Sequence, residues 1–215
     1  MENQTITGNI TVLPPVFCGS VEHYVNVRVA EATAIDWKRR FDKRFKVTHR
    51  FAIADTRGRL ELTVPIAKPQ SSQCCWGDIE ISTHGNWWDV HRIALESAYG
   101  RTPFFEYYAD SLLPMLTAGV EERFPLLKDL SDAWDTWIRH KLMLPLPVAA
   151  ETGESRPESP SIITENSNNA TDFAQYWQVR ADKIGFIGNL SVLDLIFNLG
   201  PEAIIYLDKA AGMTD

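Results

Sequence analysis

Two short segments with alternating hydrophobic and polar residues give the clearest structural signal in the chain. In residues 60–66 every second side chain is hydrophobic, which is the period of a strand with one solvated face. Residues 50–54 form a second strand-like segment, and residues 55–58 between the two have the composition of a tight turn. We therefore predict a β-hairpin here, further strands at residues 10–13 and 79–82, and an antiparallel or mixed sheet.

After the predicted strands, from residue 86 onward, the hydrophobic residues have the spacing of helices. Asn86 is a good N-cap, and the hydrophobic positions after it recur every three or four residues, which predicts an amphipathic helix of about 13 residues. The predicted inner face of this helix holds Trp87, Val90, His91, Ala94 and Ala98. A second helix should begin at Thr102-Pro103 and end before Pro114, and a third should cover residues 127–144.

A polar segment, residues 148–172, divides the chain. It contains no aromatic residue and is rich in Ser, Glu, Asn and Pro. Such a segment buries too little apolar surface to offset the entropy lost on ordering, so we expect a flexible insertion. It separates a main body, residues 1–147, from a hydrophobic tail, residues 173–215, which is too short for a core of its own and should pack on the body.

The tail carries the signals of a short helix. Ser191 is suited to be the N-cap, Asp194 stands at the third helical position, and Gly200 marks the stop. Together these elements predict one α+β domain. In it a small sheet packs against helices, and the C-terminal helical tail docks on the body.

Composition narrows the class of protein. The 215-residue chain has 28 acidic and 21 basic residues, a net charge of −7, and no long basic tract that could follow a nucleic-acid backbone. We therefore expect no nucleic-acid partner. No segment approaches the ~18 apolar residues of a membrane span, and the first residues do not resemble a secretory signal, so we expect a cytoplasmic protein without a membrane span.

Neither the cysteine spacing nor any short motif in the sequence indicates a metal or a cofactor. Cys18, Cys74 and Cys75 fit neither a disulfide framework nor the spacing of a zinc knuckle. The sequence has no nucleotide-binding glycine motif and no zinc-protease motif. We expect no metal and no cofactor, and nothing in the sequence indicates the oligomeric state.

Several short motifs occur in one order along the chain. They are Leu13-Pro14, Tyr24, Ala32, Asp36, Leu62-Thr63-Val64-Pro65, Trp87 or Trp88 with His91-Arg92, Ala98-Tyr99, Pro103-Phe104-Phe105-Glu106-Tyr107-Tyr108, Phe186, Asn189-Leu190-Ser191, Asp194-Leu195, Phe197-Asn198 and Gly200-Pro201. In this order they resemble the motifs of the WbqC-like protein family. The resemblance covers the chain except for the predicted insertion.

The resemblance implies a role in making bacterial surface polysaccharide. The family is associated with gene clusters for O-antigen and similar polymers, which suggests the metabolism of sugars or nucleotide-sugars. Two features depart from the family pattern: His49 replaces an asparagine before the motif arginine Arg50, and the His-Gln-Pro motif of many relatives is missing. These departures put a catalytic centre of the family type in doubt for this chain.

A basic segment with interleaved aromatic residues ends at Arg50. The default interpretation of such a charge run is solvated surface, but in an acidic protein it is also suited to hold a phosphate. We predict that Arg50, Lys46 and His49 bind the anionic part of a small-molecule ligand, an activated sugar. Arg50 is the strongest candidate because its planar guanidinium can donate two parallel hydrogen bonds to phosphate.

Two further residues are candidate ligand contacts. Tyr99 can supply a polar group to a cleft that includes His91. Asn198 can line a ligand site, although its position near a helix end equally suits a capping role.

His91 and Asp36 are the candidates for proton transfer. A histidine titrates near neutral pH, but His91 on the apolar face of a helix is also expected as a buried, hydrogen-bonded core residue. Ser191 and Asp194 have the spacing of a cap rather than of a nucleophile and its acid. Cys18 and His23 form a nucleophile and base only if the fold brings them together.

Two classes of function stay open at this point. One is an enzyme that modifies an activated amino sugar, and the other is a non-catalytic binding or scaffold protein of a polysaccharide assembly system. The sequence does not decide between them. Convergence of the basic segment and His91 on one pocket would favour the enzyme.

Limited proteolysis of the native protein should cut first within residues 150–170, because this segment has no side chains with which to form a core. Mass spectrometry of the first fragments would locate the cut. Initial cleavage between residues 50 and 66 would contradict the predicted organisation.

Overall fold

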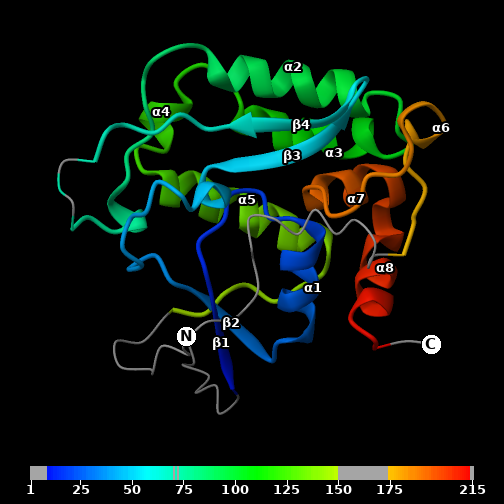
Figure 1. The fold of residues 1–215 in the computed structure, drawn as a ribbon, viewed down its shortest axis with the longest axis horizontal. Coiled ribbons are helices and arrows are strands. Elements are labelled where there is room, and N and C mark those ends of the chain that lie inside the picture. The colour runs from blue at the N-terminus through cyan, green and yellow to red at the C-terminus, as the bar shows by residue number, and fades with distance from the viewer. Residues whose placement is uncertain (1–8, 70, 72, 150–173, 214–215) are drawn as a thin grey trace.

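The predicted hairpin lies at the centre of the structure (Figure 1). β3 (Arg50–Asp55) pairs antiparallel with β4 (Gly58–Thr63), so that Arg50 lies opposite Thr63 and Ala52 opposite Glu61. Thr56-Arg57 form the two-residue loop, and Gly58 after them has φ of 120°, a conformation that glycine adopts without strain. The hairpin is confirmed, although β4 ends three residues earlier than expected.

The structure is a computed structural model, and it describes residues 9–69, 71, 73–149 and 174–213. Within these residues the two small sheets pack against helices, which confirms the α+β class. Residues 150–172 of the predicted insertion lie outside the described residues.

A second pair of strands forms a β-α-β unit. β1 (Ile10–Leu13) and β2 (Ala32–Ile35) are parallel, and α1 (Val21–Val29) connects them. The strand predicted at residues 10–13 is therefore confirmed, but only Leu13 in it is buried. The prediction of a strand at residues 79–82 was wrong. Glu80 and Ile81 each form one isolated bridge, to Leu126 and Ile66 respectively, and they form no continuous ladder.

The helices of the body follow the expected order. α2 (Trp87–Tyr99) has the predicted length, α3 (Phe105–Leu112) begins two residues after Pro103, and α5 (Leu127–Lys141) ends three residues early. Short turns lie between the main elements: η1 (Lys46–Thr48), η2 (Trp76–Asp78), η3 (Leu113–Met115) and α4 (Val120–Arg123).

The predicted inner face of α2 needs one correction. Val90 is 60% exposed, and Leu95 and Tyr99 are buried instead. On the opposite face of the helix, Arg92 pairs with Asp89 and Glu96. The buried stripe is therefore rotated around the helix, away from Val90 and toward Leu95 and Tyr99.

The tail packs onto the body through α7 and α8. It comprises α6 (Ala181–Ile184), α7 (Val192–Leu199), η4 (Gly200–Glu202) and α8 (Ala203–Ala210). Ser191 caps α7 as predicted, since its Oγ accepts a hydrogen bond from the amide of Leu193. Gly200 has a positive φ of 56°, and a side chain there would overlap the ring of Phe104.

A buried ion pair within α5 is connected by hydrogen bonds to α1 and β2. Arg139 is fully buried, and its Nε donates to Asp135 Oδ2 at 2.6 Å while its Nη1 donates to Thr33 Oγ1 at 3.0 Å. The hydroxyl of Tyr24 donates to the other oxygen of Asp135 at 2.7 Å. Because each buried charge has directed partners, the network compensates much of the cost of removing it from water.

No helix within the described ranges is long and apolar enough to cross a membrane.

Replacing Arg139 by methionine should destabilise the fold by about 3–5 kcal/mol, because Asp135 would stay buried without its cation. Urea unfolding at neutral pH measures this difference. Arg92→Met is the matched control on an exposed helix face, where losing two ion pairs should change the free energy of unfolding by about 1 kcal/mol or less. Equal effects of the two substitutions would refute the role assigned to the buried pair.

Candidate functional site

A basic hollow opens on one face of the hairpin. It has a volume of about 240 Å³, and the charged residues that line it are Lys46, Arg50, Arg59 and Glu61. We call it the hairpin hollow. Its three cations outnumber its one carboxylate, although the chain as a whole carries a net charge of −7. The arrangement favours a negatively charged ligand.

Strand geometry explains why these residues gather. Successive side chains of a strand alternate between the two faces, so Arg50 and Ala52 share a face. Glu61, which lies opposite Ala52 in β4, is on that face too. Arg59 lies opposite Ala54, one step further along. The small side chain of Ala52 lines the hollow beside the longer charged side chains.

Arg50 is the best-placed donor in the hairpin hollow. Its side chain is about one-third exposed, at 34%, and its Nη1 lies 3.8 Å from Glu61 Oε2, too far for a hydrogen bond. Its Nε is buried and has no hydrogen-bond partner among the described residues. A buried guanidinium N–H without an acceptor is costly, so a ligand oxygen at this position would be favoured.

A smaller and deeper hollow adjoins the first. It has a volume of about 80 Å³ and is lined by Cys18, His23 and Ser191, and it shares Arg50 and Arg59 with the hairpin hollow. We call it the inner hollow. The Sγ of Cys18 lies 2.9 Å from the Oγ of Ser191, although the two residues are 173 positions apart in sequence.

Three segments meet to form the inner hollow. The amide of Ser191 donates to the carbonyl of Ala52 at 2.8 Å, and the amide of Val192 donates to the carbonyl of Gly19 at 3.0 Å. The amide of Val21 donates to the carbonyl of Leu190 at 2.9 Å. Residues 190–192 therefore lie between β3 and the start of α1 and bring Ser191 to Cys18.

The two titratable groups of the inner hollow are held neutral. Burial lowers the pKa of His23 to about 4, against an opposing effect of Asp135. Burial also raises the pKa of the Cys18 thiol far above its usual range, and the contact with Ser191 only partly offsets this. At pH 7 the site therefore contains a neutral thiol and a neutral imidazole, and burial disfavours the charged form of each.

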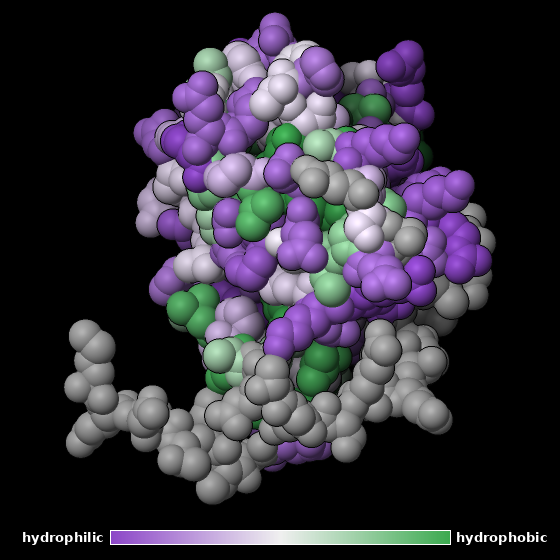
Figure 2. All heavy atoms as spheres, turned by 90° about the vertical axis from the view of Figure 1, so that its left-hand side faces the viewer, coloured by the Kyte–Doolittle hydropathy of each residue, from purple (hydrophilic) through white to green (hydrophobic). Residues whose placement is uncertain are grey.

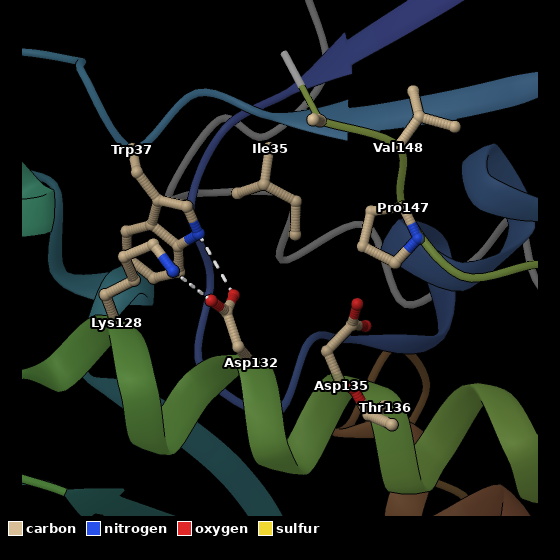
Figure 3. Close-up of a pocket in the computed structure, with 9 residues that line it drawn as sticks. Ile35, Trp37, Lys128, Asp132, Asp135, Thr136, Pro147 and Val148 are labelled. Atoms are coloured by element: carbon tan, nitrogen blue, oxygen red, sulfur yellow. Dashed lines mark hydrogen bonds and ion pairs between the residues drawn. The ribbon is translucent and has the colours of Figure 1, made fainter. Parts of the chain in front are cut away.

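A third hollow lies beside α5 (Figure 3). It has a volume of about 290 Å³, and Figure 3 shows Asp132 directed toward both Trp37 and Lys128. The Trp37 indole donates to Asp132 at 3.1 Å and Lys128 pairs with the same carboxylate, while Asp135 accepts from Tyr24 and Arg139. Because its carboxylates already bond to protein groups, this hollow is a weaker candidate than the basic one.

The structure separates the predicted ligand residues into two groups. Arg50 and Lys46 lie together in the hairpin hollow. His49 is not among its lining residues: its Nδ1 lies 3.1 Å from the carbonyl of Val64, and its ring stacks near Trp76. Burial lowers the pKa of His49.

The candidates for proton transfer do not join the basic residues. His91 is buried and its Nε2 lies 3.1 Å from the carbonyl of Thr63. Its ring meets that of Phe51, whose side chain points to the face opposite that of Arg50 because the two are neighbours in β3. Asp36 follows β2, where its amide donates to the carbonyl of Leu13, and it lines none of the three hollows.

Tyr99 and Asn198 belong to a buried polar cluster around Asp194. Asn198 donates to the carbonyl of Asp194 at 2.7 Å and accepts from the amide of Val179 at 3.0 Å. Burial, and then the charge of Asp194, raise the pKa of Tyr99. Burial also raises the pKa of Asp194 itself, although Tyr176 and other donors bond to it. These contacts tie the start of the tail to α7.

Sequence reasoning did not identify Arg59 and gave little weight to Cys18 and His23. Arg59 stands in an alternating strand, where a charged residue at an outward position is ordinary. The signal that was available is its place directly before the second predicted strand of the hairpin, although that prediction did not assign Arg59 to a strand. For Cys18 and Ser191 no local pattern indicates the contact.

No group of three or more His, Cys, Asp or Glu side chains in the described part of the chain is arranged to hold a metal ion. The polar groups of the two adjoining hollows include arginine, lysine, thiol, hydroxyl and imidazole groups and the carboxylate of Glu61. Such groups can bind an anion and move a proton.

Comparison with known proteins gives one match. The model of the WbqC-like protein family matches residues 38–148, which include the whole hairpin, α2, α3 and α5. No curated protein and no solved structure matches the chain significantly.

Acidification should destabilise the protein partly through His91. Burial lowers its pKa to about 4, so the unfolded chain, with a pKa near 6.5, binds the proton more readily as the pH falls. The contribution of His91 to the free energy of unfolding is therefore lost as the pH falls from 6.5 to 4. At pH 5 this loss is about 2 kcal/mol. Urea unfolding at pH 7 and pH 5 should show a smaller loss for His91→Gln than for the native protein.

The matched control is His84→Gln, at an exposed histidine. It should leave the pH dependence of the native protein unchanged. A pH dependence of His91→Gln identical to that of the native protein would contradict the assignment.

Proposed function

Because the chain belongs to the WbqC-like protein family, we propose that it binds an activated sugar during the synthesis of bacterial surface polysaccharide. The phosphate of the ligand occupies the hairpin hollow, where Arg50 and Arg59 donate hydrogen bonds to it. Lys46 adds positive charge at the same place. The family suggests the sugar, and the geometry of the hollow suggests the phosphate.

The unsatisfied Nε of Arg50 is the observation that carries this proposal. A guanidinium binds phosphate through parallel N–H donors, and here one of these donors is buried with no acceptor within the described residues. Glu61 stands at 3.8 Å and half exposed to solvent, so it does not occupy that position. A phosphate oxygen would complete the hydrogen bonding that the protein leaves unfinished.

The volume of the hollow fits the charged end of a ligand. At about 240 Å³ it is smaller than the roughly 300–1,000 Å³ that encloses a whole drug-sized molecule. The inner hollow extends it at its base by about 80 Å³. A phosphate in the hairpin hollow would therefore leave a small substituent room to reach Cys18.

A non-catalytic binding or scaffold protein is the second candidate. It is favoured by the placement of His91 and Asp36, neither of which lines the basic hollow. A scaffold also needs a contact surface, and the face shown in Figure 2 is largely hydrophilic, with apolar side chains scattered over it. This face therefore gives no support to the scaffold, whereas the hollow supports a small anionic ligand.

Replacing Arg50 by lysine should weaken phosphate binding by about tenfold or more, because lysine keeps the charge but loses the planar pair of donors. Calorimetric titration with inorganic phosphate and with a nucleotide-sugar measures both affinities. The thermal stability of Arg50→Lys should stay close to that of the native protein.

Arg57→Lys is the matched control. Arg57 is an exposed arginine in the loop of the same hairpin and lines neither hollow, so its replacement should leave affinity unchanged. Equal affinities of the native protein and Arg50→Lys would remove Arg50 from the site.

A further inference from the structure

We propose that the thiol of Cys18 is a nucleophile that accepts an acyl group from an acyl phosphate, with His23 as the base. The inference rests on the proposed phosphate site, since the leaving group of such a donor is the phosphate that Arg50 and Arg59 would hold. It adds a chemical step to what would otherwise be a binding site. Four features of the inner hollow support it.

Cys18 has a strained backbone conformation. Its φ is 49°, in the left-handed region that costs a non-glycine residue of the order of 1–2 kcal/mol. It stands in the tight connection between β1 and α1, two residues before the cap of the helix at Ser20. This conformation places Sγ at the wall of the inner hollow.

His23 supplies the independent sign of a ligand. It is 2% exposed, it lines the inner hollow, and its Nε2 has no hydrogen-bond partner among the described residues. A buried imidazole nitrogen normally bonds to something, so a group that enters the hollow is a candidate partner for it. In the tautomer of the neutral ring that carries its proton on Nδ1, Nε2 is an acceptor and can take a proton.

Gly19 and Tyr24 fix the ring of His23. A Cβ atom at Gly19 would lie 2.7 Å from Cδ2 of the imidazole, so the absence of a side chain lets the ring approach the backbone next to Cys18. The Tyr24 ring stands edge-on to it, with centroids 5.0 Å apart. The ring of His23 is thus packed against the backbone of the residue that directly follows Cys18.

Ser191 orients the thiol. Its Oγ contacts Cys18 Sγ at 2.9 Å and also accepts the capping hydrogen bond from Leu193. Since the cap fixes the hydroxyl, the hydroxyl in turn fixes the position of Sγ. Ser191 is a positioning residue in this scheme.

The step balances without any further reactant. Cys18 Sγ attacks the carbonyl carbon of the acyl phosphate, and the thiol proton passes to Nε2 of His23. A sulfur–carbon bond forms, and the carbon–oxygen bond to phosphate breaks with its electron pair going to the phosphate oxygen. His23 then gives the proton to that oxygen, so that hydrogen phosphate and a thioester on Cys18 are the products.

The thioester would then pass to an acceptor. An amine or hydroxyl of a sugar can attack its carbonyl carbon, which releases the thiol and leaves an amide or ester. The small volume of the inner hollow, about 80 Å³, favours a short acyl group such as acetyl. The acceptor would approach from the hairpin hollow after phosphate has left.

Acetyl phosphate tests the proposal directly. Peptide mass spectrometry of the full-length protein after incubation should find an acetyl group on Cys18 that neutral hydroxylamine removes, as it removes thioesters. Cys18→Ala should lack this label, while Cys75→Ala, a control at a half-buried cysteine, should keep it. His23→Gln should slow acetylation of Cys18 by about 100-fold or more, the usual contribution of a general base.

The pH profile distinguishes a base from a structural histidine. The charged and titratable groups around His23 are Tyr24 and Cys18 near it in sequence, Asp135 and Arg139 on α5, and Arg50 and Arg59 across the hollow. With His23 as the base, the rate should vary little between about pH 6 and 8. A thiolate acting alone would react about tenfold faster with each added pH unit, because only the ionised form is reactive.

Each outcome decides the proposal. A native protein that binds inorganic phosphate calorimetrically but never acetylates Cys18 would overturn the nucleophile and leave the proposed binding function intact. Failure to bind phosphate at all would overturn both. Unchanged acetylation in a folded His23→Gln protein, or a tenfold rise of rate per pH unit, would overturn the role of His23.

Discussion

Three backbone hydrogen bonds of residues 190–192 determine the geometry on which the candidate site depends. They connect the tail to Ala52 in the hairpin, and to Gly19 and Val21 near the start of α1. Without this connection the hairpin would still carry its arginines. The Cys18 thiol and the His23 imidazole, however, would have no fixed position relative to those arginines. The basic end of the site is therefore a local product of one hairpin, and the inner end is a product of tertiary packing.

This difference explains how much the sequence could predict. The hairpin, α2 and the cap of α7 depend on residues close together in the chain, so alternation, N-caps and turn glycines were sufficient to place them. Arg50 and Lys46 were identified for the same reason. The strand expected at residues 79–82 failed because its hydrophobic residues pack into the core while each backbone pairing lasts for a single residue.

The deeper half of the site could not be predicted. Ser191 shows the strongest capping signal in the tail, and that signal was correct, but the same hydroxyl also contacts Cys18 from 173 positions away. The parallel pairing of β1 with β2 was equally hidden, because a four-residue strand with no alternation has no local signature. Where a residue has two roles, local patterns reveal the local one.

The dependence of the inner hollow on residues 190–192 also has a consequence for synthesis of the chain. A ribosome makes β1, α1 and the hairpin long before it makes Ser191, so the emerging polypeptide carries its cysteine without the hydroxyl that orients it. Contacts of such wide sequence separation form late in folding. Chains that stop short of the tail would lack the segment that contacts Cys18 and bonds to Ala52 in β3, so the exposed strand edge would favour aggregation.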